Sequence, residues 1–303
     1  MKHINFVAEI SANHLGSLSR AHLLVEAASR AGANSVKLQT YKAETMTLNL
    51  SKFRVSSDHN LWGGVNLYQL YEEAMTPWEW HKELFLHASE LGIEAFSSPF
   101  DRGAVDFLEG LNCPIYKIAS LETGDVDLIS YAASTGKRMI ISTGASTLEE
   151  IERAVEAAEL VRDKLTLLVC TSSYPAHPAD AHVNRITTLR EKFNVDVGLS
   201  DHTLGMGVSI AAIALGATAI EKHFTLSRSD GGVDGAFSME PEEFAMLVKE
   251  GTSALQALGK SEWSMQESEK ESRRLRRSLY IVKDVKAGDL VTHENVRAIR
   301  PGS

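Results

Sequence analysis

Eight short apolar segments recur between residues 4 and 224, and a stretch with helical patterning separates each segment from the next. Several of them contain continuous apolar runs, such as residues 139–141 and 167–170, which is typical of parallel strands covered on both faces. The predicted strands are Ile4–Ile10, Ser35–Thr40, Ile93–Ser98, Ile115–Ala119, Met139–Thr143, Thr166–Thr171, Val195–Ser200 and Ala219–Phe224. Regular alternation of strands and helices predicts an α/β fold around a parallel sheet.

The segments between the strands carry helix signals. Ala21–Ala31 places leucine and alanine at helical spacing. Thr76–Glu79 and Ser146–Glu149 both resemble capping boxes, because in each a hydroxyl is followed three residues later by a glutamate. Gly32 and Gly216 come shortly before predicted strands and are expected to end the preceding helices.

Eight strand–helix units within about 260 residues predict a (β/α)8 barrel, the TIM-barrel fold. The structural alternative is a doubly wound open sheet. Such a sheet usually has a glycine-rich turn after its first strand, whereas residues 9–14 here are Glu-Ile-Ser-Ala-Asn-His. A barrel formed by residues 1–260 is therefore the predicted fold.

The composition of the chain excludes some classes of function but says little about the fold. The 303-residue chain is 44% apolar and 23% charged, which is ordinary for a globular enzyme. Its 31 basic and 40 acidic residues give a net charge of −9, so nucleic acid and anionic membranes are not expected partners. The sequence shows no signal peptide and no uncharged apolar run of ~18 residues, which predicts a cytoplasmic protein that does not span a membrane. Cys113 and Cys170 are predicted to be small buried residues in a reducing compartment.

Two regions depart from a plain barrel. Residues 41–75 form a long connection after the second strand, and loops of this length often cover or grip a substrate. Residues 261–277 are predicted to be a polar linker with a solvated, arginine-rich helix, and residues 278–303 an incomplete β-rich domain. About 25 residues cannot hold a core of their own, so this last segment is expected to dock on the barrel or on a partner chain, or to stay mobile.

Polar side chains end all eight predicted strands. In a TIM barrel the catalytic groups lie at the carboxyl ends of the strands, where the following loops meet. A barrel with a purely structural role would need few of them, because buried charges must be paired. The candidates at these ends include Glu9, Lys37, Gln39, Ser98, Lys117, Ser120, Glu122, Ser142, Ser172, Tyr174, Ser200, His202, Glu221 and His223.

Two lysines, Lys37 and Lys117, lie inside apolar strands. One interpretation is that they pair with Glu9 or Glu221. The other is that both face a small, doubly charged anion at the barrel mouth, where hydroxyl groups and loop N–H groups would complete a phosphate or carboxylate site. The hydroxyl groups would be those of Ser98, Ser120, Ser142, Ser172 and Ser200.

His202 and His223 end the seventh and eighth strands, so their side chains can converge. A single histidine in a barrel is more often a general base or a hydrogen-bonded core residue. Two of them, beside Asp201 and Glu221, favour a divalent metal with open positions for a substrate oxygen. So few protein ligands suit Mn²⁺, Mg²⁺ or Co²⁺ better than a structural zinc ion.

The glycine-rich loop at residues 227–240 has two open interpretations. Asp230 and Asp234 lie among its three glycines, as in a mobile loop that grips a hydroxylated ligand. A solvated turn would have the same composition.

Several motifs taken together resemble one known family. They include EISANHLGS, SVKLQTYKAE, FSSPFD, YKIASLE, CTSSYP, GLSDHTLG and IEKHFTLSRSDGGVDGAFSMEP. This combination resembles the nonulosonic (sialic) acid synthases over essentially the whole chain. The segment LWGGVNLYQLYEEAMTPWEWH is most similar to the pseudaminic acid synthase branch.

The resemblance implies a reaction and a set of roles. Phosphoenolpyruvate is joined to an N-acylated hexose, which in the pseudaminic branch is 2,4-diacetamido-2,4,6-trideoxy-L-altrose, and phosphate leaves by C–O cleavage. His202 and His223 match ligands of a metal, Mn²⁺ above all, that polarises the aldehyde, and no organic cofactor is needed. Glu9 and Glu122 match acid–base or sugar-contacting carboxylates. The family positions that contact phosphoenolpyruvate correspond to Lys37, Lys117, Ser120, Ser142 and Ser200, with Ser98 nearby. The family positions that contact the sugar correspond to Gln39, Tyr174 and Asp234.

The chain departs from the family pattern in two places. Ser172 stands where sialic acid synthases commonly have asparagine. The family's C-terminal antifreeze-like (SAF) domain covers the active site of the partner subunit in a homodimer and supplies an arginine. Only part of that domain is expected here, because Arg300 matches this arginine and the sequence ends three residues later. Such a shortened domain is expected to weaken or abolish activity.

Other functions stay open at this point. Within the family, the alternatives are N-acetylneuraminate and legionaminic acid synthases. A second possibility is another metal-assisted barrel enzyme, such as an aldolase or a 3-deoxy-octulosonate-type synthase that acts on a sugar phosphate. It would need basic residues for a second phosphate, and residues 273–277 are the spare cluster. A third is a catalytically silent barrel that binds sugars or partners.

Overall fold

The structure is a computed structural model that describes residues 3–57 and 61–300. The chain divides into two compact units, Met1–Leu258 and Gly259–Ser303. Each unit is described by itself.

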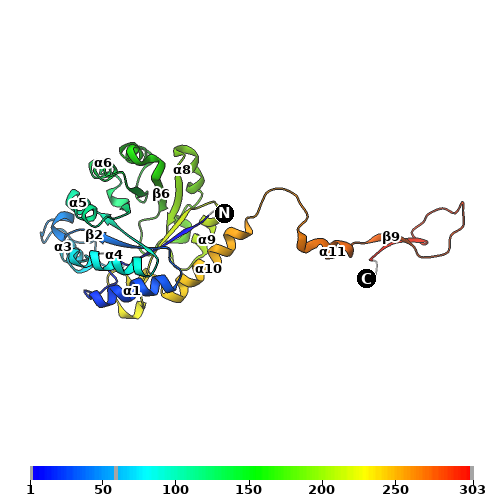
Figure 1. Cartoon of the computed structure of the whole chain (residues 1–303), viewed down its shortest axis with the longest axis horizontal. Coiled ribbons are helices and arrows are strands. Elements are labelled where there is room, and N and C mark those ends of the chain that lie inside the picture. Colours follow the sequence, from blue (N-terminus) through cyan, green and yellow to red (C-terminus); the bar gives the residue numbers. More distant parts are fainter. Residues whose placement is uncertain (1–2, 58–60, 301–303) are drawn as a thin grey trace. The chain divides into compact units, whose positions relative to one another are not determined.

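The first unit is a closed barrel of eight parallel strands with helices around it (Figure 1). The strands pair in sequence order, and β8 pairs with β1 to close the barrel. The predicted (β/α)8 fold is thereby confirmed, and each predicted strand end lies within one residue of the observed one. The strands are β1 Asn5–Glu9, β2 Ser35–Thr40, β3 Glu94–Pro99, β4 Ile115–Ile118, β5 Arg138–Ser142, β6 Leu165–Cys170, β7 Asp196–Ser200 and β8 Ala219–His223.

Ten α-helices belong to the described part of this unit, and they pack through buried alanine, leucine and isoleucine side chains. Gly32 and Gly216 have φ values of 88° and 90° and follow the ends of helices, as predicted. The helices are α1 Leu18–Arg30, α2 Ala43–Met46, α3 Leu67–Ala74, α4 His81–Glu90, α5 Arg102–Gly110, α6 Val126–Ser134, α7 Leu148–Ala157, α8 Arg185–Phe193, α9 Gly207–Ala214 and α10 Pro241–Ala257. Short 3₁₀ turns are η1 Trp78–Trp80, η2 Ser120–Glu122, η3 Glu159–Lys164, η4 Pro178–Asp180, η5 Arg228–Asp230 and η6 Gly235–Phe237.

Two predicted helix starts are wrong in detail. The hydroxyl of Thr76 is buried without a hydrogen-bond partner among the described residues, and η1 precedes α4 there. The N-cap of α7 is Thr147 and not Ser146. Thr147 Oγ1 accepts a bond of 3.3 Å from the Glu150 N–H, and the Glu150 carboxylate accepts one of 2.7 Å from the Thr147 N–H. Adjacent serine and threonine can both cap a helix, so the sequence pattern does not choose between them.

Strand register brings the site residues together. Glu9 is level with Lys37 on β2 and with His223 on β8, and Ser200 is level with Glu221. Because all eight strands are parallel, their carboxyl ends meet at one end of the barrel. We call this end, with the loops that leave it, the rim.

The long connection after β2 contains α2 and α3. It reaches past the end of β1 to the loop after β8, because the indole N–H of Trp62 donates to the carbonyl of Val233 in that loop at 3.0 Å. On the near side, Tyr71 of α3 lies edge-on to Tyr41, with ring centres 5.8 Å apart. This segment therefore contributes side chains to two parts of the rim.

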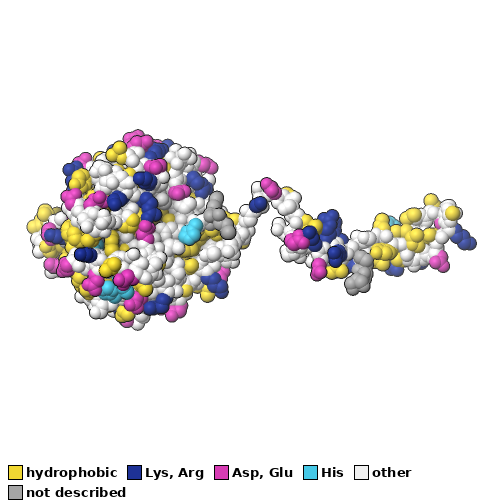
Figure 2. All heavy atoms as spheres, viewed as in Figure 1, with side chains coloured by type: hydrophobic (Ala, Val, Ile, Leu, Met, Phe, Trp, Pro, Cys, Tyr) yellow, Lys and Arg dark blue, Asp and Glu magenta, His cyan; other side chains and the backbone are white. Residues whose placement is uncertain are grey.

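The second unit contains η7 Glu267–Glu269, the short helix α11 Lys270–Arg274, and a hairpin of β9 Ser278–Ile281 and β10 Val296–Ile299. The two strands are antiparallel, with Ser278 opposite Ile299. No residue of 259–300 is buried, and hydrophobic side chains lie on the hairpin surface (Figure 2). Leu279, Leu290 and Val291 are 75%, 83% and 79% exposed. The prediction that this segment lacks a core is therefore confirmed for its described residues.

In the part of the chain that the structure describes, no helix is both long and apolar enough to cross a membrane.

Candidate active site

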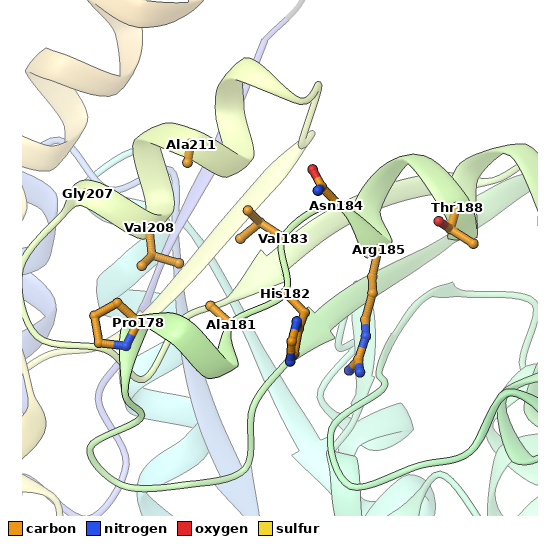
Figure 3. Close-up of a pocket in the computed structure, with 10 residues that line it drawn as sticks. All are labelled: Pro178, Ala181, His182, Val183, Asn184, Arg185, Thr188, Gly207, Val208 and Ala211. Atoms are coloured by element: carbon orange, nitrogen blue, oxygen red, sulfur yellow. The ribbon is translucent and has the colours of Figure 1, made fainter.

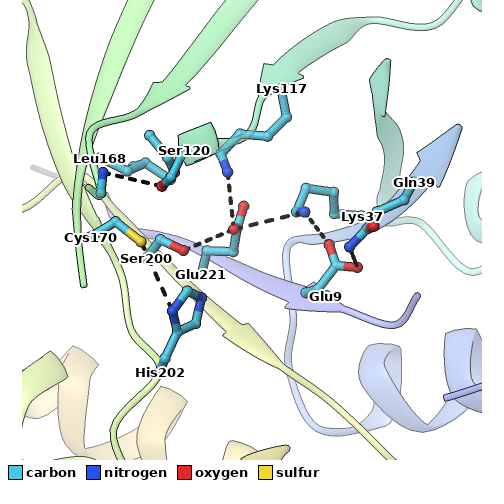
Figure 4. Close-up of polar contacts among 12 residues, drawn as sticks. Glu9, Lys37, Gln39, Lys117, Ser120, Leu168, Cys170, Ser200, His202 and Glu221 are labelled. Carbon is cyan, nitrogen blue, oxygen red and sulfur yellow. Dashed lines mark hydrogen bonds and ion pairs between the residues drawn. The ribbon is translucent and has the colours of Figure 1, made fainter. Parts of the chain in front are cut away.

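Four charged side chains form one network inside the rim (Figure 4). Glu221 Oε1 lies 3.2 Å from the ammonium of Lys117 and 3.8 Å from that of Lys37. Lys37 also forms a close ion pair with Glu9. All four residues are between 1% and 5% exposed. The lysines therefore pair with Glu9 and Glu221, as the first sequence interpretation predicted, but Glu221 joins both pairs in a single cluster.

The charges in this network shift one another's pKa values. Burial lowers the pKa of Lys37, but Glu221 and Glu9 outweigh burial and the pKa is raised. For Lys117, burial dominates, Lys37 adds to it, and the pKa is lowered. Burial raises the pKa of Glu221, but Lys117 and Lys37 outweigh it and lower that pKa to about 2. The cluster therefore contains a carboxylate that stays ionised and one lysine, Lys117, whose pKa lies below its ordinary value.

Glu9 also has neutral partners. Its Oε1 accepts 3.1 Å from the backbone N–H of Ser11 and 3.3 Å from the side-chain amide of Gln39. Gln39, which the sequence placed at the end of the second strand, therefore lies against Glu9 on the β1–β2 side of the rim.

Three oxygens in the network region are buried without a hydrogen-bond partner among the described residues. They are Ser98 Oγ at the end of β3, Ser142 Oγ at the end of β5, and Glu221 Oε2. An unpaired buried polar group costs about 1–3 kcal/mol, and such groups are rare in native proteins unless a ligand, ion or water pairs with them. The two serine hydroxyls are among those that the sequence predicted for an anion site.

Gly144 lies where other predicted hydroxyl groups meet. Its N–H donates to Ser120 Oγ at 3.1 Å. A Cβ at Gly144 would contact Ser172 Oγ, lie 2.7 Å from Ser120 Oγ and lie 3.1 Å from Cys170 Sγ. Only glycine fits here, and its absent side chain lets Ser120 and Ser172 approach the same point.

The two candidate metal ligands converge. The ring centres of His202 and His223 are 5.4 Å apart. His202 Nδ1 donates to the carbonyl of Thr171 at 2.9 Å, and His223 Nδ1 lies 3.3 Å from Asp234 Oδ2. In metalloproteins, ligating histidines use their second nitrogen as His202 does, whereas His223 Nδ1 has no hydrogen-bond partner among the described residues. The arrangement leaves Nε2 of each ring for a ligand.

Aromatic rings surround this histidine pair. Tyr174 lies over His202, with ring centres 4.3 Å apart, and Phe237 is 4.9 Å from His223. Trp62, from the long connection, is 6.0 Å from Tyr174 and 6.3 Å from Phe237. The histidines therefore lie beside an apolar wall. Residues 41–75 were expected to cover or grip a substrate, but no sequence pattern singled out Trp62 as the residue that reaches this wall.

Cys170 was predicted to be a small buried core residue, and this prediction is incomplete. The side chain is buried at the end of β6, but its Sγ lies 3.9 Å from His202 Nδ1. Burial raises the pKa of the thiol, but His202 outweighs burial and lowers it to about 7. Its position as the last residue of a strand was the only signal that it would reach the rim.

Glu122 lies in η2, after β4, and its Oε2 is buried without a hydrogen-bond partner in the described structure. Burial raises the pKa of this carboxyl group to about 7, although Lys117 acts in the opposite direction. A carboxyl group with such a pKa can exchange a proton at neutral pH.

The raised pKa of Glu122 predicts a pH-dependent stability. The fold favours the protonated carboxyl group. The loss of folding stability caused by burying the ionised form is therefore absent below the ordinary pKa of 4.5 and grows as the pH rises to about 7. We expect Glu122→Gln to be more stable than wild type by about 1–3 kcal/mol at pH 8 and by nothing at pH 4.5. Thermal melts across this range test it. The exposed Glu156→Gln is the control, and a constant difference between Glu122→Gln and wild type would contradict the prediction.

Other predicted residues lie outside this cluster. Of the two loop aspartates, only Asp234 faces a histidine, whereas Asp230 pairs with Arg20 at 2.8 Å. Arg300 belongs to the second unit, directly after β10, so the geometry of the barrel does not test it. Within residues 3–57 and 61–300, no three histidine, cysteine, aspartate or glutamate side chains are grouped as ligands of one ion. A metal on His202 and His223 would therefore need ligand or water oxygens as well.

A separate cavity of about 500 Å³ lies between η4, α8 and α9 (Figure 3). His182 and Arg185 are its most polar lining residues, and none of the predicted site residues lines it. It is distinct from the rim cluster.

Comparison with known proteins agrees with this fold and identifies the family. Residues 24–263 match the NeuB family, and the chain belongs to that family. It is 42% identical over 301 residues to a pseudaminic acid synthase of Campylobacter jejuni, covering 99% of this chain and 88% of that one. An N,N'-diacetyllegionaminic acid synthase of the same species is 36% identical over 310 residues, covering 100% and 92%. The solved N-acetylneuraminic acid synthetase of Leptospira borgpetersenii, in complex with citrate, matches with a TM-score of 0.80 and 31% identity, covering 89% and 90%.

Proposed function

We propose that this protein condenses phosphoenolpyruvate with 2,4-diacetamido-2,4,6-trideoxy-L-altrose to form pseudaminic acid and phosphate. The nearly full-length similarity to pseudaminic acid synthases supports this choice, and the lower identity of the legionaminic acid relative makes that reaction the alternative. N-acetylneuraminate synthesis is a further alternative within the family.

The observation that carries the proposal is the unpaired pair of hydroxyls beside two ammonium groups. Ser98 and Ser142 are buried and lack partners among the described residues, while Lys37 and Lys117 meet at Glu221. An anion such as phosphoenolpyruvate would supply oxygen acceptors for all four groups. Ser120 and Ser200, each within 3.1 Å of a network or loop partner, would complete its contacts.

The sugar would occupy the neighbouring part of the rim. We assign its contacts to Gln39, Tyr174 and Asp234, and Ser172 to the boundary between the two substrates. The sugar's acetamido methyl groups and its deoxygenated C6 are apolar, and the wall of Trp62, Tyr174 and Phe237 would bury them.

A divalent ion, Mn²⁺ first and Mg²⁺ or Co²⁺ next, fits the histidine pair. The hydrogen-bonded Nδ1 of His202, and the Nδ1 of His223 beside Asp234, favour Nε2 ligation, and oxygen ligands would fill the remaining positions. When bound, the ion would act as a Lewis acid toward the aldehyde of the open-chain sugar.

The reaction places distinct demands on the residues of this chain. C3 of phosphoenolpyruvate forms a bond to the aldehyde carbon, water adds at C2, and the C2–O bond to phosphate breaks. The two lysines would hold the phosphate and carboxylate so that C3 faces the aldehyde, which removes the entropy of a bimolecular encounter. Water loses one proton and the new alkoxide gains one. We assign these transfers to Glu9 and Glu122, and the pKa of Glu122 near 7 suits that role.

A substrate panel tests the function. Purified protein is mixed with phosphoenolpyruvate, Mn²⁺ and each of several acetamido sugars, and both phosphate release and the mass of the keto-acid product are measured. Product with the L-altrose sugar supports the proposal. Product with the legionaminic precursor or N-acetylmannosamine alone would select the alternatives. If product forms only with a sugar phosphate, the protein is a different barrel synthase. If no product forms under any condition, the barrel is catalytically silent.

The apolar wall gives a further prediction. We expect Trp62→Ala to raise the KM for the sugar about 10-fold, because an aromatic ring contributes on the order of 1–2 kcal/mol to such a contact. The KM for phosphoenolpyruvate should change less than twofold. Steady-state kinetics with each substrate varied in turn measures both values. The fully exposed Trp263→Ala is the matched control, and an equal rise in both KM values would contradict a sugar-specific role.

For the second unit, we propose that residues 278–303 form the beginning of an antifreeze-like (SAF) domain, after a linker at 261–277. Its exposed hairpin residues support a partner surface, which in a homodimer would be the other subunit. Arg300 would then contact substrate in the partner's active site. We further propose a cytoplasmic location, since phosphoenolpyruvate is a cytoplasmic metabolite. Sedimentation analysis of the purified chain tests the dimer.

A further inference from the structure

A second buried ion pair lies directly beside the histidine pair, and the mechanism above does not use it. Asp201 precedes His202, Lys222 precedes His223, and both charged residues are about 99% buried. Lys222 Nζ lies 3.1 Å from Asp201 Oδ2. Each histidine is therefore attached through the main chain to one member of this pair.

Both members of the pair have all their hydrogen-bonding capacity used. Lys222 Nζ also donates to the carbonyls of Thr203 at 2.6 Å and Gly205 at 3.0 Å. Asp201 Oδ1 accepts from the N–H and the hydroxyl of Thr203 at 2.9 and 2.7 Å, and its Oδ2 accepts from the Ser209 hydroxyl at 2.6 Å. These bonds connect β8, the loop after β7, and the first turns of α9.

The bonded loop is the segment that carries His202. Thr203 and Gly205 are held on one side of His202 and Asp201 on the other, so its main chain is fixed from both directions. The carbonyl of His202 in turn accepts from Ala176 N–H at 2.9 Å. The ring can then reach the Thr171 carbonyl, to which Nδ1 donates its proton.

A buried ion pair is seldom the most stable choice, because apolar residues of similar size are often equally or more stabilising. Such a pair is better explained where a unique conformation is needed. We propose that Asp201 and Lys222 are positioning residues that fix the ring orientation and tautomer of His202, and through β8 the position of His223, so that both Nε2 atoms face the same point. Only the measurement of Mn²⁺ affinity rests on the proposed function, whereas the measurement of the His202 tautomer does not.

Histidine-selective ¹⁵N NMR and Mn²⁺ titration test the proposal. Lys222→Met removes the pair, and Ser209→Ala is the milder variant that removes a single bond to Asp201. Ile213→Val, in the buried face of α9, is the control for a comparable loss of stability, about 1 kcal/mol. We expect wild type to show His202 with Nδ1 protonated, and Ser209→Ala to lose that single tautomer while its Mn²⁺ dissociation constant rises about 10-fold.

The control separates positioning from general destabilisation. Ile213→Val should keep the tautomer and the Mn²⁺ affinity of wild type. If Ser209→Ala at a matched melting temperature keeps both as well, the proposal is overturned. If Lys222→Met does not fold, Ser209→Ala alone decides. If wild type binds no Mn²⁺, the proposed metal site fails, and the tautomer measurement still decides whether the pair positions His202.

Discussion

Replacing His202 with alanine is expected to reduce kcat/KM about 10³-fold or more while the barrel stays folded. The imidazole is one of two whose ring centres lie 5.4 Å apart, and one remaining ring cannot hold a divalent ion in a site with so few protein ligands. Removal leaves the Thr171 carbonyl without its partner, which costs about 1–2 kcal/mol of stability. A loss of that size lowers the melting temperature by a few degrees only.

The measurement combines kinetics with Mn²⁺ binding by electron paramagnetic resonance. His223→Ala should behave like His202→Ala, and the double variant should be no worse than either single one, because the two rings act as a unit. His22→Ala on the outer helix α1 is the control. Full activity of His202→Ala would show that the histidine pair has no role in turnover.

Lys117→Met is expected to weaken phosphoenolpyruvate binding about 100-fold. Loss of a charge-assisted hydrogen bond in a buried site costs about 1.5–3 kcal/mol, and the upper value corresponds to this factor. Methionine has a similar volume, and Glu221 keeps Lys37 as a partner at 3.8 Å, so the fold should tolerate the change. Isothermal titration calorimetry with phosphoenolpyruvate alone measures the dissociation constant without turnover.

Two variants distinguish ligand binding from charge balance. Lys164→Met, whose ammonium donates to the Gly136 carbonyl outside the rim, should bind phosphoenolpyruvate as wild type does. The double variant Lys117→Met with Glu221→Gln removes the lysine together with the carboxylate it neutralises. If the double variant recovers wild-type affinity, Lys117 serves only as a partner of Glu221 and does not contact the anion.

The fold was readable from the sequence because each strand is an apolar run with clear ends. The lysines in Ser35–Thr40 and Ile115–Ile118 could be expected to meet at the barrel mouth, since a charge within such a strand has few places to go, and both lie beside Glu221. The parallel barrel then requires all strand ends to meet, and this places Glu9, Lys37 and Glu221 together without further information.

The features that could not be predicted are the course of the long loops and the contacts between segments that lie far apart in the sequence. Trp62 reaches Val233 across 171 positions, and no periodicity encodes the course of a loop. Cys170 has the composition of a core residue, and only the spacing of β6 against β7 brings it to His202. Asp230 and Asp234 look alike in the sequence, yet only one faces a histidine.

The alternation of side chains along β7 and β8 has a consequence for how such proteins can diversify. Ser200 and Glu221 point into the barrel, while the next residues, Asp201 and Lys222, contact each other and α9. Inserting or deleting one residue in either strand would exchange the two faces, placing the Asp201–Lys222 pair inside the barrel and the Glu221 carboxylate against the surrounding helices. Point changes within these strands preserve this division of faces, whereas a change of strand length does not.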